Sequence, residues 1–270
     1  MSTLAAVRRV RWSRGLLQGW RIVAAGSSFM LFGVAGLLLG GIVLPLLLLV
    51  ARDQARRQIM ARRVIGAAFT LFVGVMRGLG CIRVRVSGVE GLRLPGVVIS
   101  ATHPTLIDVV LLLALAPQLS CVVKHSVRRN PFMAGVVRAA GYIDNDLDGP
   151  ALLERCAEVI RDGGSILIFP EGTRTVPDTP VRLRRGAAAI ALAARASLVP
   201  VVMHCAPPAL TKVQRWYDLP PDSLQIRIDV HPAWPSTGYL TRAPNRAIAA
   251  RQMTRDLESF YRGELRAVGS

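Results

Sequence analysis

The sequence predicts an α/β protein with a mostly parallel sheet that helices cover. Short apolar runs typical of buried strands alternate with segments of helical periodicity from about residue 80 onward. A longer apolar run lies near the N-terminus and predicts a membrane-embedded helical segment. We therefore expect two parts: residues 1–79, with membrane-embedded and interfacial helices, and residues 80–270, with the sheet and a C-terminal amphipathic helix.

The N-terminal part carries no charged side chain from Ile22 to Val50. A helix needs roughly 20 apolar residues to cross a bilayer, so this run is long enough. Arginines flank it on both sides, so the positive-inside rule does not decide its orientation. Two arrangements stay open: a single span, and a re-entrant or interfacial hairpin broken near Gly40-Gly41 or Pro45. A signal peptide is disfavoured by the length of the run and by the basic block that follows it.

The segment from Ala51 to Leu79 has apolar residues at approximately helical spacing, with arginines on the other face. This pattern predicts an interfacial amphipathic helix that leads into the second part of the chain. An ordinary core helix is the alternative.

The second part contains the elements of the expected sheet. Strands are expected at residues 81–86, 96–100, 119–123, 166–169, 198–203 and 224–230, the last as an edge strand. Helices are expected at residues 108–115, 130–140, 150–161, 186–196 and 245–265. Because strands and helices alternate, the sheet should be mostly parallel.

The formal net charge is +17, and only Lys124 and Lys212 are lysines among the 34 basic residues. Such an excess indicates a polyanion or an anionic surface as partner. Nucleic acid is disfavoured, because no zinc-ligand spacing, RNA-binding signature or aromatic platform accompanies the charge. Anionic membrane lipids fit better, because the arginines cluster beside apolar segments.

Cysteine usage predicts buried, reduced thiols. The four cysteines are far apart in the sequence and form no C-x-x-C pair; they are Cys81, Cys121, Cys156 and Cys205. The four histidines are not clustered either. We therefore expect no disulfide framework and no metal site.

A histidine and a carboxylate stand five positions apart, His103 and Asp108, after the run that predicts a strand at 96–100. On one straight helix these side chains would point about 140° apart. They can meet only if His103 precedes the helix and Asp108 lies in its first turns. Pro104 suits such a start. A neutral imidazole is a suitable general base, and a carboxylate on its other nitrogen fixes the tautomer.

A second polar block, Phe169-Pro-Glu-Gly-Thr-Arg-Thr175, follows another expected strand. Gly172 lets a backbone approach a ligand closely, and Thr173 adds a hydroxyl beside Glu171. Arg174 offers a planar fork for phosphate oxygens. Lys124 ends a third expected strand and either adds charge to the same pocket or is simply solvated.

The two blocks resemble those of the glycerolipid acyltransferase family, whose members acylate glycerol phosphate and lysophospholipids. His103-x4-Asp108 matches the family's HX4D motif, and Phe169 to Arg174 match all six positions of its second block. The resemblance implies O-acyl transfer from an acyl carrier protein or coenzyme A thioester to a lysolipid or glycerol-phosphate-like hydroxyl. It makes residues 80–270 the acyltransferase domain, with His103 as general base oriented by Asp108 and with no cofactor.

The same resemblance implies that Glu171, Gly172, Thr173, Arg174 and Lys124 bind the acceptor. The apolar run from Ile22 to Val50, with its flanking arginines, predicts a protein embedded in the bacterial inner membrane. The catalytic domain should face the cytoplasm, where acyl thioesters are made and thiols stay reduced. A lipid-binding or assembly subunit without turnover is the alternative, which the retention of both motif residues disfavours.

Two positions depart from the family pattern. Asn145 follows Ile143-Asp144 where an arginine is usual, and Thr102 stands where asparagine is usual. One phosphate contact is then missing unless a neighbouring arginine replaces it; the candidates are Arg182, Arg184 and Arg185. The segments 123–132, 141–146 and 216–217 also resemble a bacterial subgroup associated with aryl-polyene or related lipids, for which an acyl carrier protein would be the donor.

Overall fold

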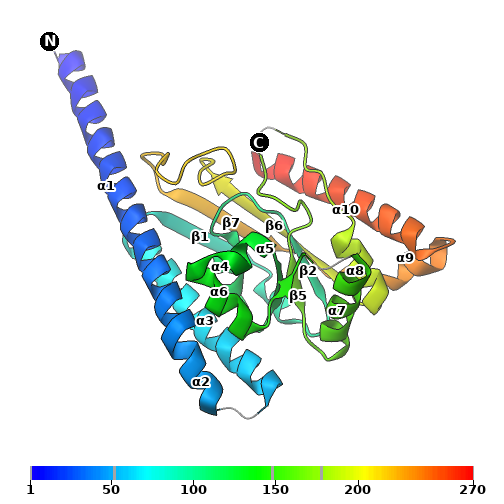
Figure 1. Cartoon of the computed structure of the whole chain (residues 1–270). Helices are drawn as coiled ribbons and strands as arrows, with labels where there is room; N and C mark the ends of the chain where they lie inside the picture. The colour runs from blue at the N-terminus through cyan, green and yellow to red at the C-terminus, as the bar shows by residue number, and fades with distance from the viewer. Residues whose placement is uncertain (1, 51–52, 147–148, 177–178, 270) are drawn as a thin grey trace.

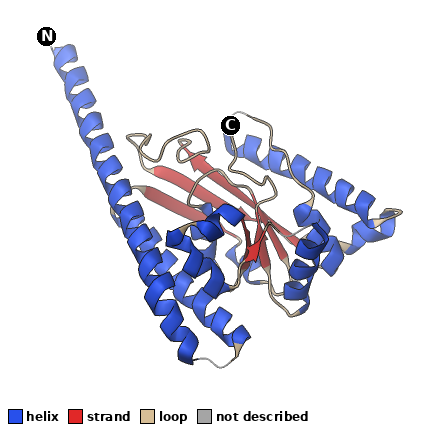
Figure 2. Cartoon of the chain, in the orientation of Figure 1, coloured by secondary structure: helices blue, strands red, loops and turns tan. Residues whose placement is uncertain are grey.

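The computed structural model describes residues 2–50, 53–146, 149–176 and 179–269 and contains one seven-stranded sheet (Figures 1 and 2). The strand order is β1-β7-β6-β2-β5-β3-β4. The strands are β1 (Ile82–Ser87), β2 (Val98–Ala101), β3 (Ser120–Val123), β4 (Ile143–Asp144), β5 (Ile166–Ile168), β6 (Leu198–Ala206) and β7 (Leu224–Val230). From β6 to β4 all neighbours are parallel, whereas β7 is antiparallel to β6 and parallel to β1. The predicted fold class, α/β with a mostly parallel sheet, is confirmed.

The prediction that residues 224–230 form an edge strand is wrong. β1 pairs with β7 along its whole length, from Ile82 opposite Leu224 to Ser87 opposite Asp229, and thereby becomes the edge itself. The alternating sequence of β7 arises because its side chains are buried on one face of the sheet and mostly exposed on the other. Alternation of apolar and polar side chains indicates that one face of the sheet is buried and the other exposed. It does not indicate whether both edges of the strand are hydrogen-bonded.

Helices cover the sheet in two layers (Figure 1). The N-terminal helix α1 (Ser2–Leu38) continues through a π-helical turn (Leu39–Val43) into α2 (Leu44–Val50). The remaining helices are α3 (Gln54–Gly78), α4 (Asp108–Leu115), α5 (His125–Arg129), α6 (Pro131–Ala140), α7 (Gly149–Arg161), α8 (Gly186–Ala194), α9 (Thr237–Arg242) and α10 (Arg246–Gly269), with a 3₁₀ turn at Val89–Arg93. α1, α3, α4 and α6 pack together on one face, and α7, α8 and α10 pack on the other.

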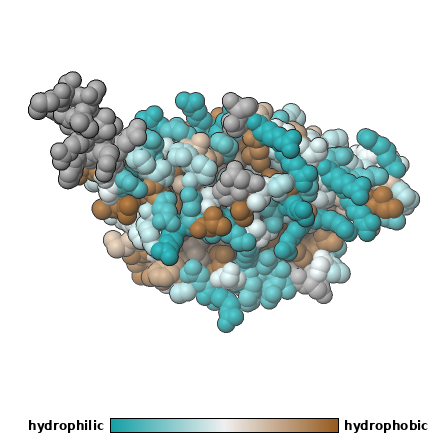
Figure 3. Space-filling view, turned by 90° about the horizontal axis from the view of Figure 1, so that it is seen from above, coloured by the Kyte–Doolittle hydropathy of each residue, from teal (hydrophilic) through white to brown (hydrophobic). Residues whose placement is uncertain are grey.

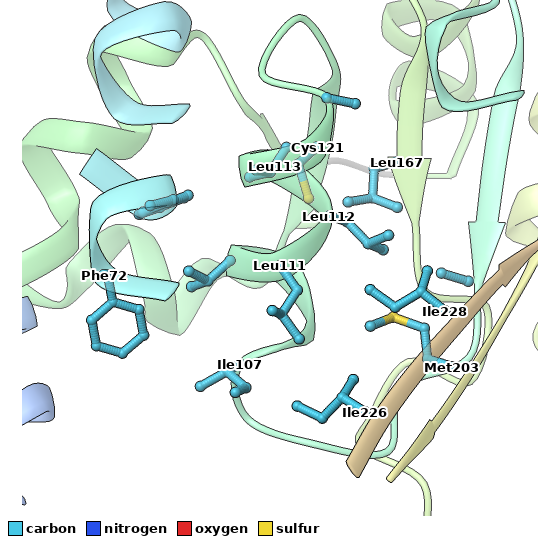
Figure 4. Packing of buried hydrophobic residues seen from close by; sticks show 14 of the residues in the cluster. Phe72, Ile107, Leu111, Leu112, Leu113, Cys121, Leu167, Met203, Ile226 and Ile228 are labelled. Atoms are coloured by element: carbon cyan, nitrogen blue, oxygen red, sulfur yellow. The ribbon is translucent and has the colours of Figure 1, made fainter. Parts of the chain in front are cut away.

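The alternation of strand side chains builds the two hydrophobic cores. Val98 of β2 faces the core beneath α8 and α10, whereas the next residue, Ile99, faces the core beneath α4. Figure 4 shows α4 lying between Phe72 of α3 and the sheet, with Leu111 and Leu112 in the interface. Because α4 is covered from both sides, its position against the strand ends is fixed.

The apolar run near the N-terminus is one continuous helical path and is not broken at Gly40-Gly41 or at Pro45. Pro45 has no backbone N–H to donate, and the π-helical turn directly before it absorbs the mismatch. The chain reverses only after α2. α3 then runs back along α1, since Phe29 lies against Phe72 and Phe32 against Phe69, with ring centroids 6.4 and 5.8 Å apart.

The apolar face of α3 is buried by protein. Ile65, Phe69, Phe72 and Met76 are all 6% exposed or less and pack with α4 and α6. The face that the sequence predicted to lie at an interface therefore belongs to the core, as in the alternative of an ordinary core helix.

Glycines set the close approach of the N-terminal helix to α6. A Cβ atom on Gly36 would lie 2.4 Å from the carbonyl oxygen of Phe132, and one on Gly40 would lie 3.0 Å from the Cα of Gly135. A methyl group at Gly36 can be accommodated only if the helices separate, because the atom it meets is backbone.

We predict that Gly36→Ala lowers the free energy of unfolding by about 1–3 kcal/mol, the usual cost of overpacking. Gly41→Ala is the matched control, because a Cβ on Gly41 meets nothing within 4 Å. Thermal unfolding of both variants in detergent micelles measures the difference. Equal melting temperatures for the two variants would contradict the close packing of α1 on α6.

Candidate active site

The two polar blocks and Lys124 all follow strands that run in the same direction. β2 lies parallel to β5, and β5 lies parallel to β3, so their carboxyl ends meet at one edge of the sheet. His103 follows β2, Glu171 follows β5, and Lys124 follows β3 and precedes α5. The topology thus gathers segments that are about seventy residues apart in the sequence.

His103 and Asp108 meet as the sequence predicted. α4 begins at Asp108, and His103 lies in the turn before it. The His103 Nδ1 is 2.8 Å from Asp108 Oδ2, and the Asp108 side chain is fully buried. The Phe169 ring lies against the imidazole, with ring centroids 4.3 Å apart. Since Asp108 occupies Nδ1, Nε2 is the nitrogen that can accept a proton from a bound group.

Thr105 completes the shell around the buried carboxylate. Its backbone N–H donates to Asp108 Oδ2 at 2.7 Å, and its hydroxyl donates to Oδ1 at 2.5 Å. Thr105 is not among the site residues predicted from the sequence. The signal was present, because Thr105-Leu-Ile-Asp108 has the Thr-x-x-acid spacing of a helix N-terminus.

Glu171 joins the two blocks. Its Oε1 accepts hydrogen bonds from the His103 N–H at 3.0 Å and from the Thr175 hydroxyl at 2.8 Å. The Thr175 N–H also donates to the His103 carbonyl at 2.7 Å. Burial raises the pKa of Glu171 above its usual range, although these two donors and the nearby His103 act in the opposite direction. The position of His103 therefore depends on Glu171 and Thr175, neither of which the sequence assigned to that task.

Gly172 and Thr173 form the turn after Glu171, and both are partly buried. Gly172 has a φ of +68°, and a Cβ atom there would lie 2.8 Å from the Arg184 Nε. The exposed side chain of Arg184 is thus laid along the turn, and its backbone N–H donates to the Pro170 carbonyl at 2.8 Å. Arg184, one of the three arginines that could replace the missing family arginine, therefore lies against this block.

Arg174 points one end of its guanidinium at backbone. Its Nη1 donates to the carbonyls of Leu210 at 2.9 Å and Thr211 at 2.8 Å. These contacts orient the planar group and leave its remaining N–H groups to face other partners. No local pattern indicated that residues 210 and 211 hold Arg174, because they lie in a loop that is distant in the sequence.

Both departures from the family pattern have structural roles. The Thr102 hydroxyl accepts from the Met203 N–H at 2.7 Å and donates to its carbonyl at 3.1 Å, which ties β2 to β6. Asn145 Oδ1 accepts from the His125 N–H at 3.1 Å, at the start of α5.

The four cysteines are all buried, as expected, and their thiols are free. Within the described part of the chain no group of three His, Cys, Asp or Glu side chains could hold a metal ion.

We predict that Glu171→Ala lowers the free energy of unfolding by about 1–3 kcal/mol, because it leaves two partly buried donors without an acceptor. Glu171→Gln should be at least as stable as the wild type at neutral pH, because the amide oxygen still accepts and no charge is buried. The pKa of Glu171 is raised, so wild type should lose stability relative to Glu171→Gln as pH rises from about 4.3 through the raised pKa. Urea unfolding at pH 4 and pH 7 measures both effects. A Glu171→Gln variant with a lower free energy of unfolding than Glu171→Ala would contradict the role of Glu171 in joining the two blocks.

Comparison with known proteins identifies a related domain. Residues 83–204, a range that contains both polar blocks, match the family model described as Acyltransferase. A 1-acyl-sn-glycerol-3-phosphate acyltransferase of Bacillus subtilis (strain 168) is 33% identical over 109 residues, 39% of this chain and 54% of the relative. The protein of the same name from Borreliella burgdorferi is 30% identical over 132 residues, 47% of this chain and 53% of the relative.

The chain thus spans about half the length of the curated relatives it matches. A solved structure covers more: the crystal structure of the 1-acyl-sn-glycerophosphate acyltransferase PlsC from Thermotoga maritima aligns over 94% of this chain and 97% of that one. Its TM-score is 0.61 at 19% identity, which shows a shared fold. Residues 83–204 therefore match an acyltransferase domain, and the chain shares its fold with that structure.

Proposed function

We propose that the protein is an O-acyltransferase that moves an acyl group from a thioester to a hydroxyl of a lysophospholipid or glycerol-phosphate-like acceptor. The donor is an acyl carrier protein or coenzyme A thioester. The observation that carries the proposal is the His103–Asp108 pair, in which a fully buried, three-fold hydrogen-bonded carboxylate holds Nδ1 of a partly exposed imidazole.

The chemistry follows from that geometry. His103 Nε2 takes the proton of the acceptor hydroxyl while its oxygen attacks the thioester carbonyl carbon. Asp108 stabilises the imidazolium that forms, because its carboxylate accepts from Nδ1–H. When the C–S bond breaks, the leaving sulfur takes the proton from His103, and the products are an ester and a free thiol. The HX4D block, Ser100 to Val109, contains no cysteine and its Ser100 is fully buried in β2, so direct transfer is favoured over an acyl-enzyme.

We assign the acceptor's phosphate to the turn after β5. Gly172 and Thr173 form the turn itself, and Arg174 and Arg184 flank it with positive charge. Lys124 adds a cation at the same edge of the sheet. The Glu171 side chain supports the site by holding His103, which is a different task from contact with the acceptor.

We predict that His103→Ala abolishes acyl transfer and that Asp108→Asn lowers kcat by about 10⁴-fold, as loss of an orienting carboxylate does elsewhere. The chain offers a matched control, because His125 Nδ1 also contacts an aspartate, Asp144, at 3.0 Å. His125→Ala should keep near-normal turnover. The assay is thioester consumption with lysophosphatidate as acceptor, together with circular dichroism to verify folding.

Near-normal turnover in His103→Ala would overturn the assignment of the base. A wild-type protein that binds lysolipid without turnover would support the alternative, a lipid-binding subunit.

We propose that the N-terminal hairpin lies in one leaflet of the membrane and does not cross it. Two helical stretches, Gly15–Leu47 and Gln54–Gly78, are long and apolar enough to cross a membrane. However, the catalytic part of the chain contacts the first stretch along its length, from Gln18, which donates to the Leu219 carbonyl, to Gly40, which abuts Gly135.

These contacts span about 33 Å at 1.5 Å per residue, roughly the whole hydrocarbon thickness. A perpendicular span would therefore drag the charged catalytic part into the bilayer. The opposite face of the helix is free for lipid, since its large apolar side chains are 44–74% exposed; they are Leu16, Leu17, Trp20, Val23, Met30, Leu31, Val34, Leu37, Leu38, Ile42 and Leu46. We place this face in the cytoplasmic leaflet of the bacterial inner membrane, where the flanking arginines meet anionic lipid headgroups. Residues 1–79 then attach residues 80–270, the catalytic part, to the membrane.

We predict that Gly15→Cys, at the start of the first stretch, and Gln54→Cys, just beyond the end of α2, react with a membrane-impermeant maleimide from the same side. Both positions are exposed, and the native cysteines are buried, so background labelling should be low. Both variants should label in inside-out vesicles and neither in right-side-out vesicles. Labelling of the two positions from opposite sides would instead establish a single span.

A further inference from the structure

The loop between β6 and β7, residues 207–223, touches the proposed active site. Its Leu210 carbonyl accepts from the Leu106 N–H at 3.1 Å and from Arg174 Nη1 at 2.9 Å. Leu210 adopts a φ of +55°, a strained conformation for a leucine, which these contacts help to hold. The loop is thus bonded to both polar blocks, one through Leu106 and the other through Arg174.

The same loop touches the N-terminal helix. The ring of Trp216 lies against Gly26, where a Cβ atom would be only 3.2 Å from the indole. Further along, the Leu219 carbonyl accepts from Gln18 Nε2 at 3.1 Å, and the Ser223 hydroxyl is 3.1 Å from Arg21 Nη1. The loop therefore bridges the proposed acceptor site and the helix that we place in the leaflet.

The tip of this loop exposes apolar surface although the loop is internally bonded. Val213 is 70% exposed, Trp216 is 47% exposed and Tyr217 is 38% exposed. Gln214 fixes the tip, because it accepts from the Thr211 hydroxyl at 3.1 Å and donates to the Pro208 carbonyl at 3.2 Å. The exposure is therefore built into the fold of the loop.

The chemistry of the tip fits a membrane interface. Tryptophan and tyrosine prefer the headgroup level of a bilayer, and basic side chains beside them attract anionic lipids. Lys212 and Arg215 are both exposed, and Arg215 donates to the Tyr217 hydroxyl at 2.6 Å. Figure 3, which views the molecule from above, shows hydrophilic surface over most of this face, with apolar groups beside the N-terminal helix and others in the middle and at the right.

We propose that the tip, defined by Val213, Trp216 and Tyr217, is a second membrane contact that enters the same leaflet as the apolar face of α1. The occupant is the lipid bilayer, argued from the continuity of the tip with α1 and from the basic residues beside the aromatic rings. This inference rests on the proposed placement of the N-terminal hairpin. Its consequence is that Arg174 lies at the bilayer surface, so that a lysolipid reaches it without leaving the membrane.

The direct test is fluorescence of a single-tryptophan protein, with Trp12, Trp20 and Trp234 replaced by phenylalanine. Trp216 emission should shift to the blue and be quenched in phosphatidylglycerol–phosphatidylethanolamine vesicles that carry brominated acyl chains. If the protein floats with these vesicles but Trp216 is not quenched, the tip is not in the leaflet and the proposal is wrong. If Trp216 becomes shielded from solvent as the protein concentration rises in the absence of vesicles, the tip contacts a second copy of the chain. That result would also overturn the proposal. A protein that does not bind the vesicles overturns the hairpin placement and this contact together.

A second test uses Val213→Asp, because Val213 is the most exposed of the three tip side chains. The variant should raise KM for vesicle-borne lysophosphatidate about tenfold, because the valine that the proposal buries in the bilayer no longer contributes to membrane binding. It should leave turnover of a short-chain, water-soluble acceptor unchanged. Leu94→Asp is the matched control; Leu94 is 41% exposed and precedes β2, at the opposite end of that strand from His103.

An equal loss on both acceptors would show damage to the site itself, and an unchanged KM on vesicles would exclude the membrane contact. If the wild-type protein shows no acyl transfer to either acceptor, the proposed function is contradicted. The fluorescence result would then still decide whether the tip contacts the membrane.

Discussion

The buried carboxylate of Asp108 is the group on which the rest of the site depends. An ionised carboxylate without water is stable only when hydrogen-bond donors surround it. The Thr105 amide and hydroxyl and the His103 Nδ1 supply those donors, and the start of α4 adds the favourable end of the helix dipole. Meeting this requirement fixes the tight turn from His103 to Asp108, and therefore the direction in which the imidazole faces.

A chain of hydrogen bonds links the buried carboxylate to the surface. Glu171 and Thr175 attach the second polar block to the backbone of His103, and Arg174 of that block is held by the β6–β7 loop. That loop in turn packs on α1 through Trp216. The proposed base, the proposed phosphate grip and the apolar helix are thus linked by contacts between rigid groups, which is the support that a precisely oriented site requires.

The N-terminal helices serve the fold as well as the proposed membrane attachment. One face of α3 forms part of the core beneath α4, and Gly36 of α1 and Gly40 of the π-helical turn allow the backbone of α6 to approach closely. The opposite face of α1 remains apolar and exposed. Because α1 is apolar on both faces, one face can pack against the protein while the other, in our proposal, contacts lipid.

Local sequence determined much of this protein. Strand and helix positions follow from side-chain periodicity, α4 begins and ends where the sequence predicted, and the His103–Asp108 pairing follows from helix geometry over five residues. Tertiary structure decided what depends on distant partners. β1 pairs with β7 and removes it from the edge, α4 and α6 bury the face of α3, and residues 210 and 211 capture Arg174. The physical reason is range: periodicity and turn chemistry act over a few residues, whereas sheet order and hydrogen bonds between loops depend on which surfaces meet when the chain closes.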